Sequence, residues 1–357
     1  MTDLYVAAGG GGDPIGTLIA ARTVTVDPAP ALIATYAWER PEVDPTPRPL
    51  GEGDFDGLDR GPGGGESGAA AAFTAGTRAR PPAGSTMPGL ARDLPARLLL
   101  LDPSGGLSSL ARQIAATARA AGGRIRIVDI GGDVLTHGDE PTLRSPFGDA
   151  LTLAACRLTG IPTTVYVAGP GLDGEIDERT LLGRLDGCHP LTPGTAAASA
   201  AAGALAWHPS EASALWAAAV HGARGTVRAV NDTLHLTDVS ARLYHLPLEE
   251  AIAHNPVARA LVEERPATLQ EAADVSHRIT GIHGLEHERT PAPRHDPPAG
   301  GAPVPDRDVA LKTLREAADG ADHVTLRYAA RTLGLAWTDI PALREVLGTG
   351  TPLVRLV

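Results

Sequence analysis

Lysine is almost absent from this chain, because Lys312 is the only one. A phosphate-binding P-loop needs a lysine in the pattern GxxxxGK[ST], and a pyridoxal-phosphate enzyme needs a lysine that forms a Schiff base. Lys312 lies in neither context and falls near the C-terminus of the sequence. The sequence therefore excludes both classes of protein.

Cysteine is also scarce, with Cys156 and Cys188 as the only two. They provide neither a disulfide framework nor a CxxC zinc knuckle, and they suit a reducing compartment. Neither has the glycine or histidine context of a nucleophile, and no GxSxG elbow is present. We therefore expect a cytoplasmic protein that uses neither kind of nucleophile.

Long apolar runs and basic clusters are missing as well. Without a run of about 18 apolar residues no membrane span is expected, and the first residues lack the regions of a signal peptide. A net charge of −11 without a basic cluster makes binding to nucleic-acid phosphates unfavourable. The expected partner is therefore a small-molecule ligand, with homo-oligomer formation left open.

The first half of the chain repeats an order of apolar segment, glycine turn and helical segment. Buried strands are predicted at residues 4–8, 31–37, 97–102, 125–130 and 162–168. Helices are predicted between them at residues 15–24, 108–121 and 146–158. This alternation is typical of βαβ units, so we expect an α/β protein with a Rossmann-like, mostly parallel sheet flanked by helices.

The second half has a more mixed pattern. Helices are predicted at residues 195–205, 210–221, 248–253, 257–264 and 268–277, and β structure at 226–237. Composition then divides the chain into an α/β ligand-binding core (1–290), a Pro/Gly-rich linker (291–305) and a helical C-terminal extension (306–357). Within the core, residues 41–95 are rich in Gly, Pro and Ala, and we expect them to be largely loop of low complexity.

Four loops join glycine to a carboxylate where a parallel strand is expected to end. Their candidate ligand-binding residues are Gly10, Gly11, Gly12 and Asp13; Asp129, Gly131, Gly132 and Asp133; Asp139, Glu140, Ser145 and Asp149; and Gly169, Gly171, Asp173 and Glu175. Ligands of open α/β sheets bind at the carboxyl ends of the strands, where glycine lets the backbone approach and a helix N-terminus favours an anion. The four loops together predict one shared site.

The first of these loops is not a dinucleotide-binding fingerprint. Glycines 9–12 and Gly16 do not produce the spacing of GxGxxG in any register, so the motif does not support an NAD site. Gly12 and Gly16 can instead allow close packing of a helix on a strand. Asp13 is either a helix cap before Pro14 or a ligand-binding residue.

Asp129 and Asp133 are four residues apart across a Gly-Gly turn, and three chemistries remain open for them. They can bind Mg²⁺ together with Asp149, because carboxylates are hard oxygen ligands. They can also bind a cationic amine or guanidinium through charge-assisted hydrogen bonds. Without a partner, clustered carboxylates raise one another's pKa and share a proton, which suits general acid–base catalysis.

Two histidine motifs add further candidates. In Trp207-His208-Pro-Ser-Glu211, Ser210 is a natural helix cap, while His208 and Glu211 are candidate catalytic or ligand residues. The segment at residues 283–287 fits HxxEH, which binds zinc when two histidines four apart lie on one helix. Gly284 weakens such a helix and no third ligand is evident, so a surface segment is the simpler interpretation.

Four segments of the chain stand out as longer motifs: AAGGGGD (7–13), AWERPEVDPTPRP (37–49), DIGGDVLTHGDEPTLRSPFGDAL (129–151) and VAGPGLDGEI (167–176). They resemble a family known best from archaea, the domain of unknown function 1152 family. The resemblance extends over roughly residues 3–290 and implies an α/β fold with a polar pocket, but no substrate. A run at residues 285–289 is similar to a family motif, which implies site roles for Glu286, Glu288 and Arg289.

The leading hypothesis is an enzyme acting on a small polar metabolite, of hydrolase, lyase or cyclase type. The glycine loops would hold the ligand, and Asp129, Asp133 and Asp149 would supply metal ligands or acid–base groups. One side of the site would be closed by Trp38, Glu39 and Arg40. Of these, Arg40 would pair with a carboxylate or phosphate group of the ligand. The alternatives are a non-catalytic nucleotide- or metabolite-binding protein, and a ligand-gated interaction protein whose partner binds residues 306–357.

Overall fold

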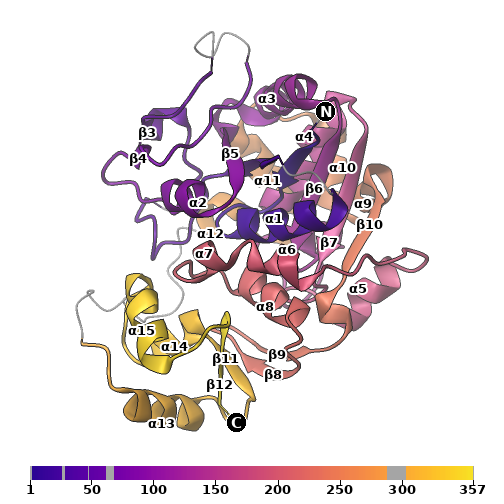
Figure 1. The fold of residues 1–357 in the computed structure, drawn as a ribbon. Helices are drawn as coiled ribbons and strands as arrows, with labels where there is room; N and C mark the ends of the chain where they lie inside the picture. Colours follow the sequence, from indigo (N-terminus) through magenta and orange to yellow (C-terminus); the bar gives the residue numbers. More distant parts are fainter. Residues whose placement is uncertain (1, 26–28, 47, 62–67, 288–302, 357) are drawn as a thin grey trace.

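The protein is described by a computed structural model that covers residues 2–25, 29–46, 48–61, 68–287 and 303–356. Its centre is a six-stranded sheet with the order β10-β7-β6-β1-β2-β5 (Figure 1). These strands are β1 (Leu4–Ala7), β2 (Ala31–Tyr36), β5 (Ala96–Leu101), β6 (Ile125–Ile130), β7 (Thr163–Ala168) and β10 (Leu243–Pro247). All neighbouring pairs are parallel except β7 and β10, which confirms the expected α/β protein with a mostly parallel sheet.

Numbered along the chain, the six strands follow the doubly wound order 3-2-1-4-5-6. The chain winds outward from β1 through β2 to β5, then returns to the other side of β1 with β6 and continues to β7. The winding direction therefore reverses between β1 and β6. A crevice forms at the carboxyl ends of two strands where this reversal occurs.

Helices cover both faces of the sheet because successive strand side chains point to opposite sides. In β1, Leu4 and Val6 pack into the core on one face, and Tyr5 and Ala7 into the core on the other. The first face is covered by α3 (Gly106–Ala121), α4 (Pro146–Thr159), α9 (Leu248–His254), α10 (Pro256–Glu264) and α11 (Leu269–Thr280). The second face is covered by α1 (Asp13–Val24), α2 (Met87–Asp93), α6 (Thr195–Ser199), α7 (Ala202–Leu205) and α8 (Glu211–Val220).

A second sheet joins the core to the end of the chain. Its order is β12-β11-β8-β9, from β8 (Gly225–Arg228), β9 (Thr233–Leu236), β11 (His323–Thr325) and β12 (Leu353–Arg355). With α13 (Arg307–Ala317), α14 (Leu326–Thr332) and α15 (Ile340–Leu347), its last two strands enclose a separate small core. The extension is thus not only helical as expected, since β11 pairs in parallel with β8 (Figure 1).

Residues 41–95 contain more structure than their composition predicts. Their described part holds β3 (Phe55–Asp56), β4 (Arg78–Ala79) and α2, and it buries Leu50, Phe55, Phe73, Met87 and Leu90. These apolar residues are widely spaced, so average composition conceals them, yet all of them pack into the core beside α1. Between these short elements the described residues form loops, and the stretch as a whole is nevertheless packed against the core.

Several element boundaries also differ from the sequence predictions. The helix expected at 195–205 is divided into α6 and α7, and the β structure expected at 226–237 forms a hairpin of β8 and β9. The helix α5 (Glu178–Arg184) and the edge strand β10 were not predicted. Most of the expected linker (291–305) lies outside the described residues, and a further short helix, α12 (Gly284–His287), precedes it.

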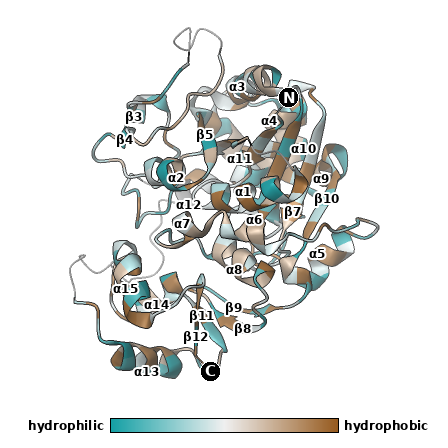
Figure 2. Ribbon diagram, in the orientation of Figure 1, coloured by the Kyte–Doolittle hydropathy of each residue, from teal (hydrophilic) through white to brown (hydrophobic). Residues whose placement is uncertain are grey.

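Hydrophobic residues are concentrated in the central layer, where Figure 2 shows them along the strands of the sheet. None of the helices in the described part of the chain combines the length and apolar character that crossing a bilayer requires. The expectation of no membrane span agrees with this finding.

Candidate functional site

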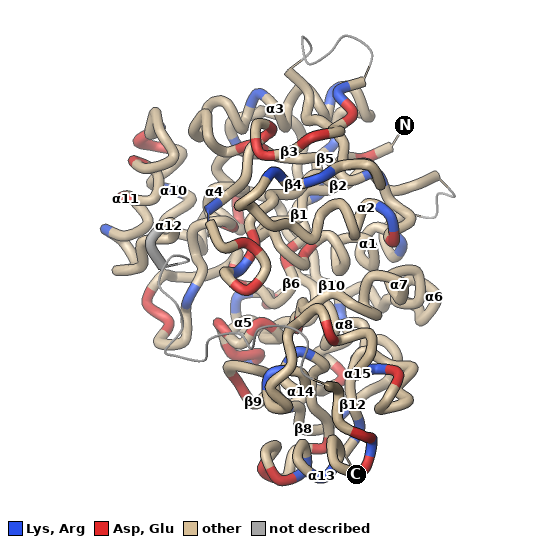
Figure 3. Tube along the Cα trace, turned by 90° about the vertical axis from the view of Figure 1, so that its left-hand side faces the viewer, with Lys and Arg blue, Asp and Glu red and all other residues tan. Residues whose placement is uncertain are grey.

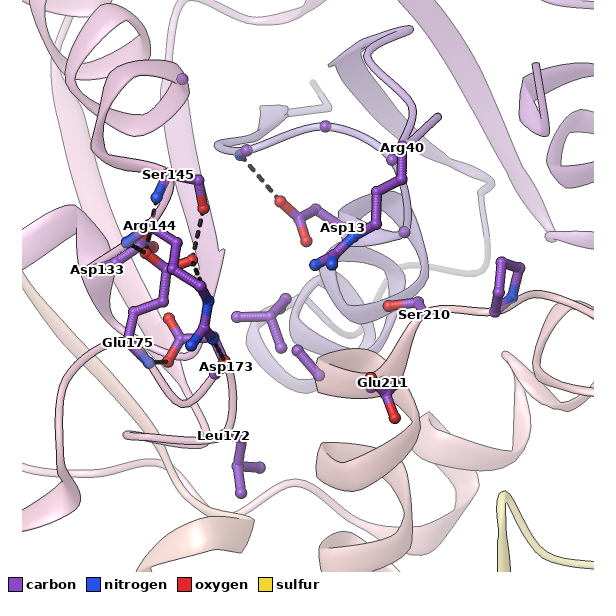
Figure 4. Close-up of a pocket in the computed structure, with 18 of the residues that line it drawn as sticks. Asp13, Arg40, Asp133, Arg144, Ser145, Leu172, Asp173, Glu175, Ser210 and Glu211 are labelled. Atoms are coloured by element: carbon purple, nitrogen blue, oxygen red, sulfur yellow. Dashed lines mark hydrogen bonds and ion pairs between the residues drawn. The ribbon is translucent and has the colours of Figure 1, made fainter. Parts of the chain in front are cut away.

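A cavity of about 210 Å³ lies at the carboxyl ends of β1 and β6, where the winding of the sheet reverses. Its wall includes fifteen residues that the sequence singled out: Gly10, Gly11, Gly12, Asp13, Trp38, Glu39, Arg40, Asp129, Asp133, Ser145, Asp149, Asp173, Glu175, His208 and Glu211. In Figure 4, Asp133, Asp173 and Glu175 lie on one side of this cavity, and Asp13 and Arg40 lie on the other. Loops far apart in sequence thus form one acidic pocket.

Other candidates lie elsewhere. Six of the predicted ligand-binding residues do not line the cavity: Gly131, Gly132, Asp139, Glu140, Gly169 and Gly171. Asp139 is exposed, and Glu140 forms an ion pair with Arg184 at 2.6 Å. Glu288, Arg289 and the side chain of Glu286 lie outside the described residues.

Asp13 is the first residue of α1, but it does not cap the helix. Gly12 occupies the cap position, and the Asp13 carboxylate turns back to accept a hydrogen bond from the Gly9 N–H at 2.9 Å. Arg40 points toward this carboxylate from the opposite loop (Figure 4). Burial raises the pKa of Asp13 to about 7, although the Gly9 hydrogen bond and Arg40 act against that rise.

Close packing of α1 on β6 depends on Gly16. A Cβ atom at this position would lie 2.3 Å from Cδ1 of Ile130, at the end of β6. The expected packing role of Gly16 is therefore confirmed. It holds the start of α1, with Asp13, close to Asp129 on β6.

Asp129, Asp133 and Asp149 form the acidic triad at the base of the pocket. Each offers a carboxylate oxygen, and these oxygens all lie within 4.8 Å of one another. Gly131 and Gly132 have φ angles of 129° and 116°, a conformation that favours glycine, and this turn places Asp133 close to Asp129. Asp149 approaches from the first turn of α4. The glycines of this loop thus shape the site without lining it.

The triad has few protein partners for its charge. Asp129 accepts a hydrogen bond from the Val134 N–H at 3.1 Å, whereas Oδ1 of Asp149 is buried without any hydrogen-bond partner among the described residues. Trp38 Nε1 and Asp173 Oδ2, also on residues of the pocket wall, are buried and unpaired in the same way. Buried polar atoms normally have partners, so these three atoms leave unused hydrogen-bonding capacity in the pocket wall.

Burial is the main cause of the unusual acidity of the triad. It raises the pKa of Asp129 to about 7, with a further rise from the nearby charge of Asp13. It also raises the pKa values of Asp133 and Asp149 well above their ordinary range, and the neighbouring carboxylates add to both shifts. The pocket therefore favours a neutralising proton or a bound cation.

Glu175 and Ser145 fix the loops on one side of the pocket. Glu175 accepts hydrogen bonds from the backbone N–H groups of Arg144 (2.7 Å) and Ser145 (2.9 Å) and from the Ser145 hydroxyl (2.5 Å). Arg144 also forms an ion pair with Asp232 at 3.3 Å and donates to the Asp173 carbonyl at 2.7 Å. This network links the loops after β6 and β7 to each other (Figure 4). Through Asp232 it also reaches the turn of the β8–β9 hairpin.

His208 is held as a neutral ring. The Thr86 hydroxyl donates its hydrogen to Glu39 at 2.5 Å, so the Nε2–H of His208 must donate to that hydroxyl oxygen at 3.0 Å. Nδ1 accepts the Ser210 N–H at 3.1 Å. Burial, followed by the charge of Arg327, lowers the pKa of His208 to about 3. Both nitrogens are occupied, which favours a structural role over the predicted catalytic one.

Glu211 lies in the first turn of α8, as predicted, and Ser210 occupies the cap position without forming a side-chain capping bond. The Glu211 carboxylate accepts a hydrogen bond from the Val230 N–H at 3.0 Å and another from the Thr325 hydroxyl. It also lies 3.6 Å from Arg327. These contacts connect the pocket wall to the C-terminal extension.

The HxxEH segment shows no zinc-binding arrangement in its described part. The His283 ring lies 3.2 Å from Asp274 and 2.9 Å from Gln270, and the side chain of His287 is outside the described residues. Among the described residues, the acidic triad is the only group of three or more His, Cys, Asp or Glu side chains whose ligand atoms lie close enough together to hold one ion.

Sequence reasoning missed Glu42, Arg144, Asp232 and Arg327, which also line the pocket. Arg144 directly precedes Ser145 in the resemblance motif, and Asn231-Asp232 is a turn signal between two strands, so these two had a detectable signal. Glu42 lies in the resemblance segment at residues 37–49 and had the same kind of signal, whereas Arg327 had none, because only the folded chain brings it to the pocket.

The fold and site define a doubly wound α/β protein with an acidic pocket at its switch point. The chain belongs to the family described as protein of unknown function (DUF1152), whose model matches residues 4–292, and the resemblance predicted from the sequence is confirmed. No curated protein and no solved structure matches the chain. The family match includes every loop of the acidic pocket up to Glu211 and ends before the C-terminal extension.

Proposed function

We propose that this protein is a divalent-cation-dependent enzyme that acts on a small polar metabolite, in a reaction of hydrolase, lyase or cyclase type. The observation that carries the proposal is the acidic triad, whose three buried carboxylates lie within reach of one ion while Oδ1 of Asp149 has no protein partner. A cytoplasmic location remains the expectation, and homo-oligomer formation remains open.

A hard divalent cation fits the triad better than a cationic substrate group. Oxygen ligands lie about 2.1 Å from Mg²⁺ and about 2.3–2.6 Å from Ca²⁺, so ligand oxygens around one ion are at most about 4.2–5.2 Å apart. The triad oxygens are within 4.8 Å of one another, which meets the limit for an ion of the size of Ca²⁺, whereas Mg²⁺ would require the carboxylates to draw together to about 4.2 Å. An amine or guanidinium is larger and needs directed hydrogen bonds from each carboxylate. When no ion is bound, a proton shared among the carboxylates would reduce their mutual repulsion.

The remaining pocket residues suggest how a substrate is held. A bound divalent cation would polarise a substrate oxygen or activate a water molecule. Asp13, with a pKa raised by burial to about 7, suits proton transfer near neutral pH. Arg40 and Arg144 line the wall and can pair with an anionic group of the substrate.

A dinucleotide is a poor candidate for this ligand. In dinucleotide-binding folds the pyrophosphate lies at the N-terminus of the first helix. Here the Asp13 carboxylate occupies that region and accepts the Gly9 N–H, so a phosphate would meet a negative charge there. This arrangement argues, like the glycine spacing, against NAD.

A non-catalytic metabolite-binding protein is the second candidate. It is favoured by the pocket residues whose hydrogen-bonding groups are already used by the protein, namely Glu175, Ser145 and His208. Such residues position loops and cannot easily exchange protons with a substrate. Conversion of the ligand, rather than its binding alone, separates the two candidates.

The cation site can be tested with Tb³⁺, a hard cation whose luminescence is excited through a nearby tryptophan. Trp38 lines the same cavity as the triad, so bound Tb³⁺ should luminesce on tryptophan excitation, and Mg²⁺ or Mn²⁺ should displace it. Asp133→Asn and Asp149→Asn should weaken binding about tenfold or more, equivalent to about 1.4 kcal/mol. Asp139→Asn is the matched control, because Asp139 is exposed and lies outside the pocket.

Equal Tb³⁺ affinities in wild type and both triad variants would contradict the cation site. Conversion is then tested by incubating the Mg²⁺-loaded protein with a mixture of small polar metabolites and following each compound by mass spectrometry. An enzyme depletes one compound and forms a product, and Asp133→Asn abolishes this. A binding protein retains a compound unchanged.

A further inference from the structure

Arg327 is a buried cation that the C-terminal extension contributes to the pocket wall. It lies on α14, and only 10% of its side chain is exposed. Its guanidinium is 2.7 Å from the Glu42 carboxylate and 3.6 Å from the Glu211 carboxylate. Both carboxylates line the cavity, one on the loop after β2 and the other on α8.

Four further contacts hold the extension against the core. The Thr325 hydroxyl donates to Glu211, and Trp337 Nε1 donates to the Glu42 carbonyl at 3.0 Å. Arg344 donates to the Leu205 carbonyl at 3.2 Å, and the Trp337 ring lies 6.5 Å from the Trp207 ring. The extension therefore contacts the loop after β2, α7 and α8, in addition to pairing through β11.

We propose that the C-terminal extension is a structural wall of the ligand site, and that Arg327 is a positioning residue that holds residues 40–44 and Glu211 in place around the pocket. The presence of a ligand in the pocket depends on the proposed function, whereas the structural role of the extension does not. The extension lies outside residues 4–292, which the family model matches. It would therefore add a wall to a pocket that is otherwise formed by the matched residues. This role replaces the idea of a separate partner-binding module.

Arginine suits this position for a physical reason. Glu42 and Glu211 would repel each other across the wall, and a planar guanidinium with several donors can contact both at once. Arg40 lies two residues before Glu42, so the pair between Glu42 and Arg327 also determines where Arg40 stands relative to Asp13. Loss of Arg327 should therefore loosen the pocket mouth and leave the acidic triad intact.

Hydrogen exchange measured without any metal tests the wall directly. In Arg327→Met, amides of residues 40–44 and of the β8–β9 hairpin should exchange severalfold faster than in wild type, and Arg327→Lys should lie between the two. Arg307→Met is the matched control, because Arg307 is an exposed arginine of the same extension. Glu42→Gln provides a milder disruption if Arg327→Met fails to fold.

A second readout is the rate at which Tb³⁺ leaves the site when a chelator is added. Arg327→Met and Glu42→Gln should release the ion severalfold faster at an unchanged number of bound ions, whereas Arg307→Met should match wild type. Unchanged exchange at residues 40–44 in both Arg327→Met and Glu42→Gln would overturn the proposed wall. If no protein binds Tb³⁺ but the hydrogen exchange changes as expected, the proposed cation site is wrong. The structural role of the extension is then still supported.

Discussion

Asp149 combines an unfavourable effect on stability with the cation-binding role proposed for it. Its carboxylate is buried, lacks a partner at Oδ1 and lies among like charges, all of which favour the protonated form in the folded chain. A carboxyl group whose folded pKa is raised stabilises the protein at low pH, and this stabilisation is lost as the pH rises above about 3.9, the unfolded value. At pH 8 without metal, Asp149 should therefore reduce stability.

We predict that Asp149→Asn raises the free energy of unfolding by about 1–2 kcal/mol at pH 8 in the presence of a chelator, while it weakens cation binding. Urea denaturation followed by tryptophan fluorescence measures the first effect. Asp139→Asn, at an exposed position, should change stability little. If Asp149→Asn is instead less stable than wild type, the Asp149 carboxylate must have a favourable partner in the folded protein, which would contradict the structure.

His208 gives the opposite dependence on pH. Its folded pKa is lowered by burial to about 3, so it contributes stability above the unfolded value of about 6.5 and loses it as the pH falls toward the folded value. Between pH 7 and pH 5 wild type should lose about 2 kcal/mol through this residue. His208→Gln should lose correspondingly less, as measured by urea denaturation at both pH values. The same substitution at exposed His221 serves as the control and should leave the wild-type loss in place.

The residues of the site were predictable to very different extents. Asp129 and Asp133 could be found because they flank a glycine turn directly after a buried strand, and Asp149 follows in the next helix. The roles of their neighbours depend on distant partners: the neutral ring of His208 is fixed by Thr86, 122 residues away in sequence. Nothing in the local sequence around Arg327 reveals that it meets Glu42.

At the scale of elements, the contact between α1 and β6 determines the distance between two acidic loops. A methyl group at Gly16 would collide with Ile130, so we predict that Gly16→Ala lowers stability by about 1–3 kcal/mol and weakens Tb³⁺ binding by displacing Asp13 and Asp129. Gly183→Ala in α5 is the control, since a Cβ there has nothing within 4 Å. It should be neutral or stabilise by up to about 1 kcal/mol. If Gly16→Ala and wild type have the same free energy of unfolding in urea, the Ile130 side chain must move away from the added methyl group without destabilising the protein.

Elements of the central sheet were predicted well because their physical signal is local. Strands buried on both faces read as continuous apolar runs, and β6 was predicted at its observed bounds, Ile125–Ile130. The strands β11 and β12 have three residues each, too few for any periodicity to be detected. Similarly, the structure within residues 41–95 depends on single apolar side chains that reach the core, and composition does not register them.

At the scale of the whole molecule, strand order and the meeting of the loops follow from topology. The sequence indicated parallel strands but not that β6 would pair with β1, and this pairing brings the loop at Asp129 beside the loop at Asp13. Figure 3 shows acidic residues on the loops between the central sheet and the C-terminal elements. The net charge was visible from the start, whereas the meeting of these acidic side chains in one pocket required the fold.

The wall built by Arg327 ties the pocket to the order in which the chain is made. The glycine loop and the acidic triad are synthesised within the first 149 residues, but Arg327 and β12 leave the ribosome much later. A nascent chain, or a product truncated before residue 327, would carry the carboxylates without the part that encloses them. If residues 306–357 form the proposed wall, the site is enclosed only after they have been translated.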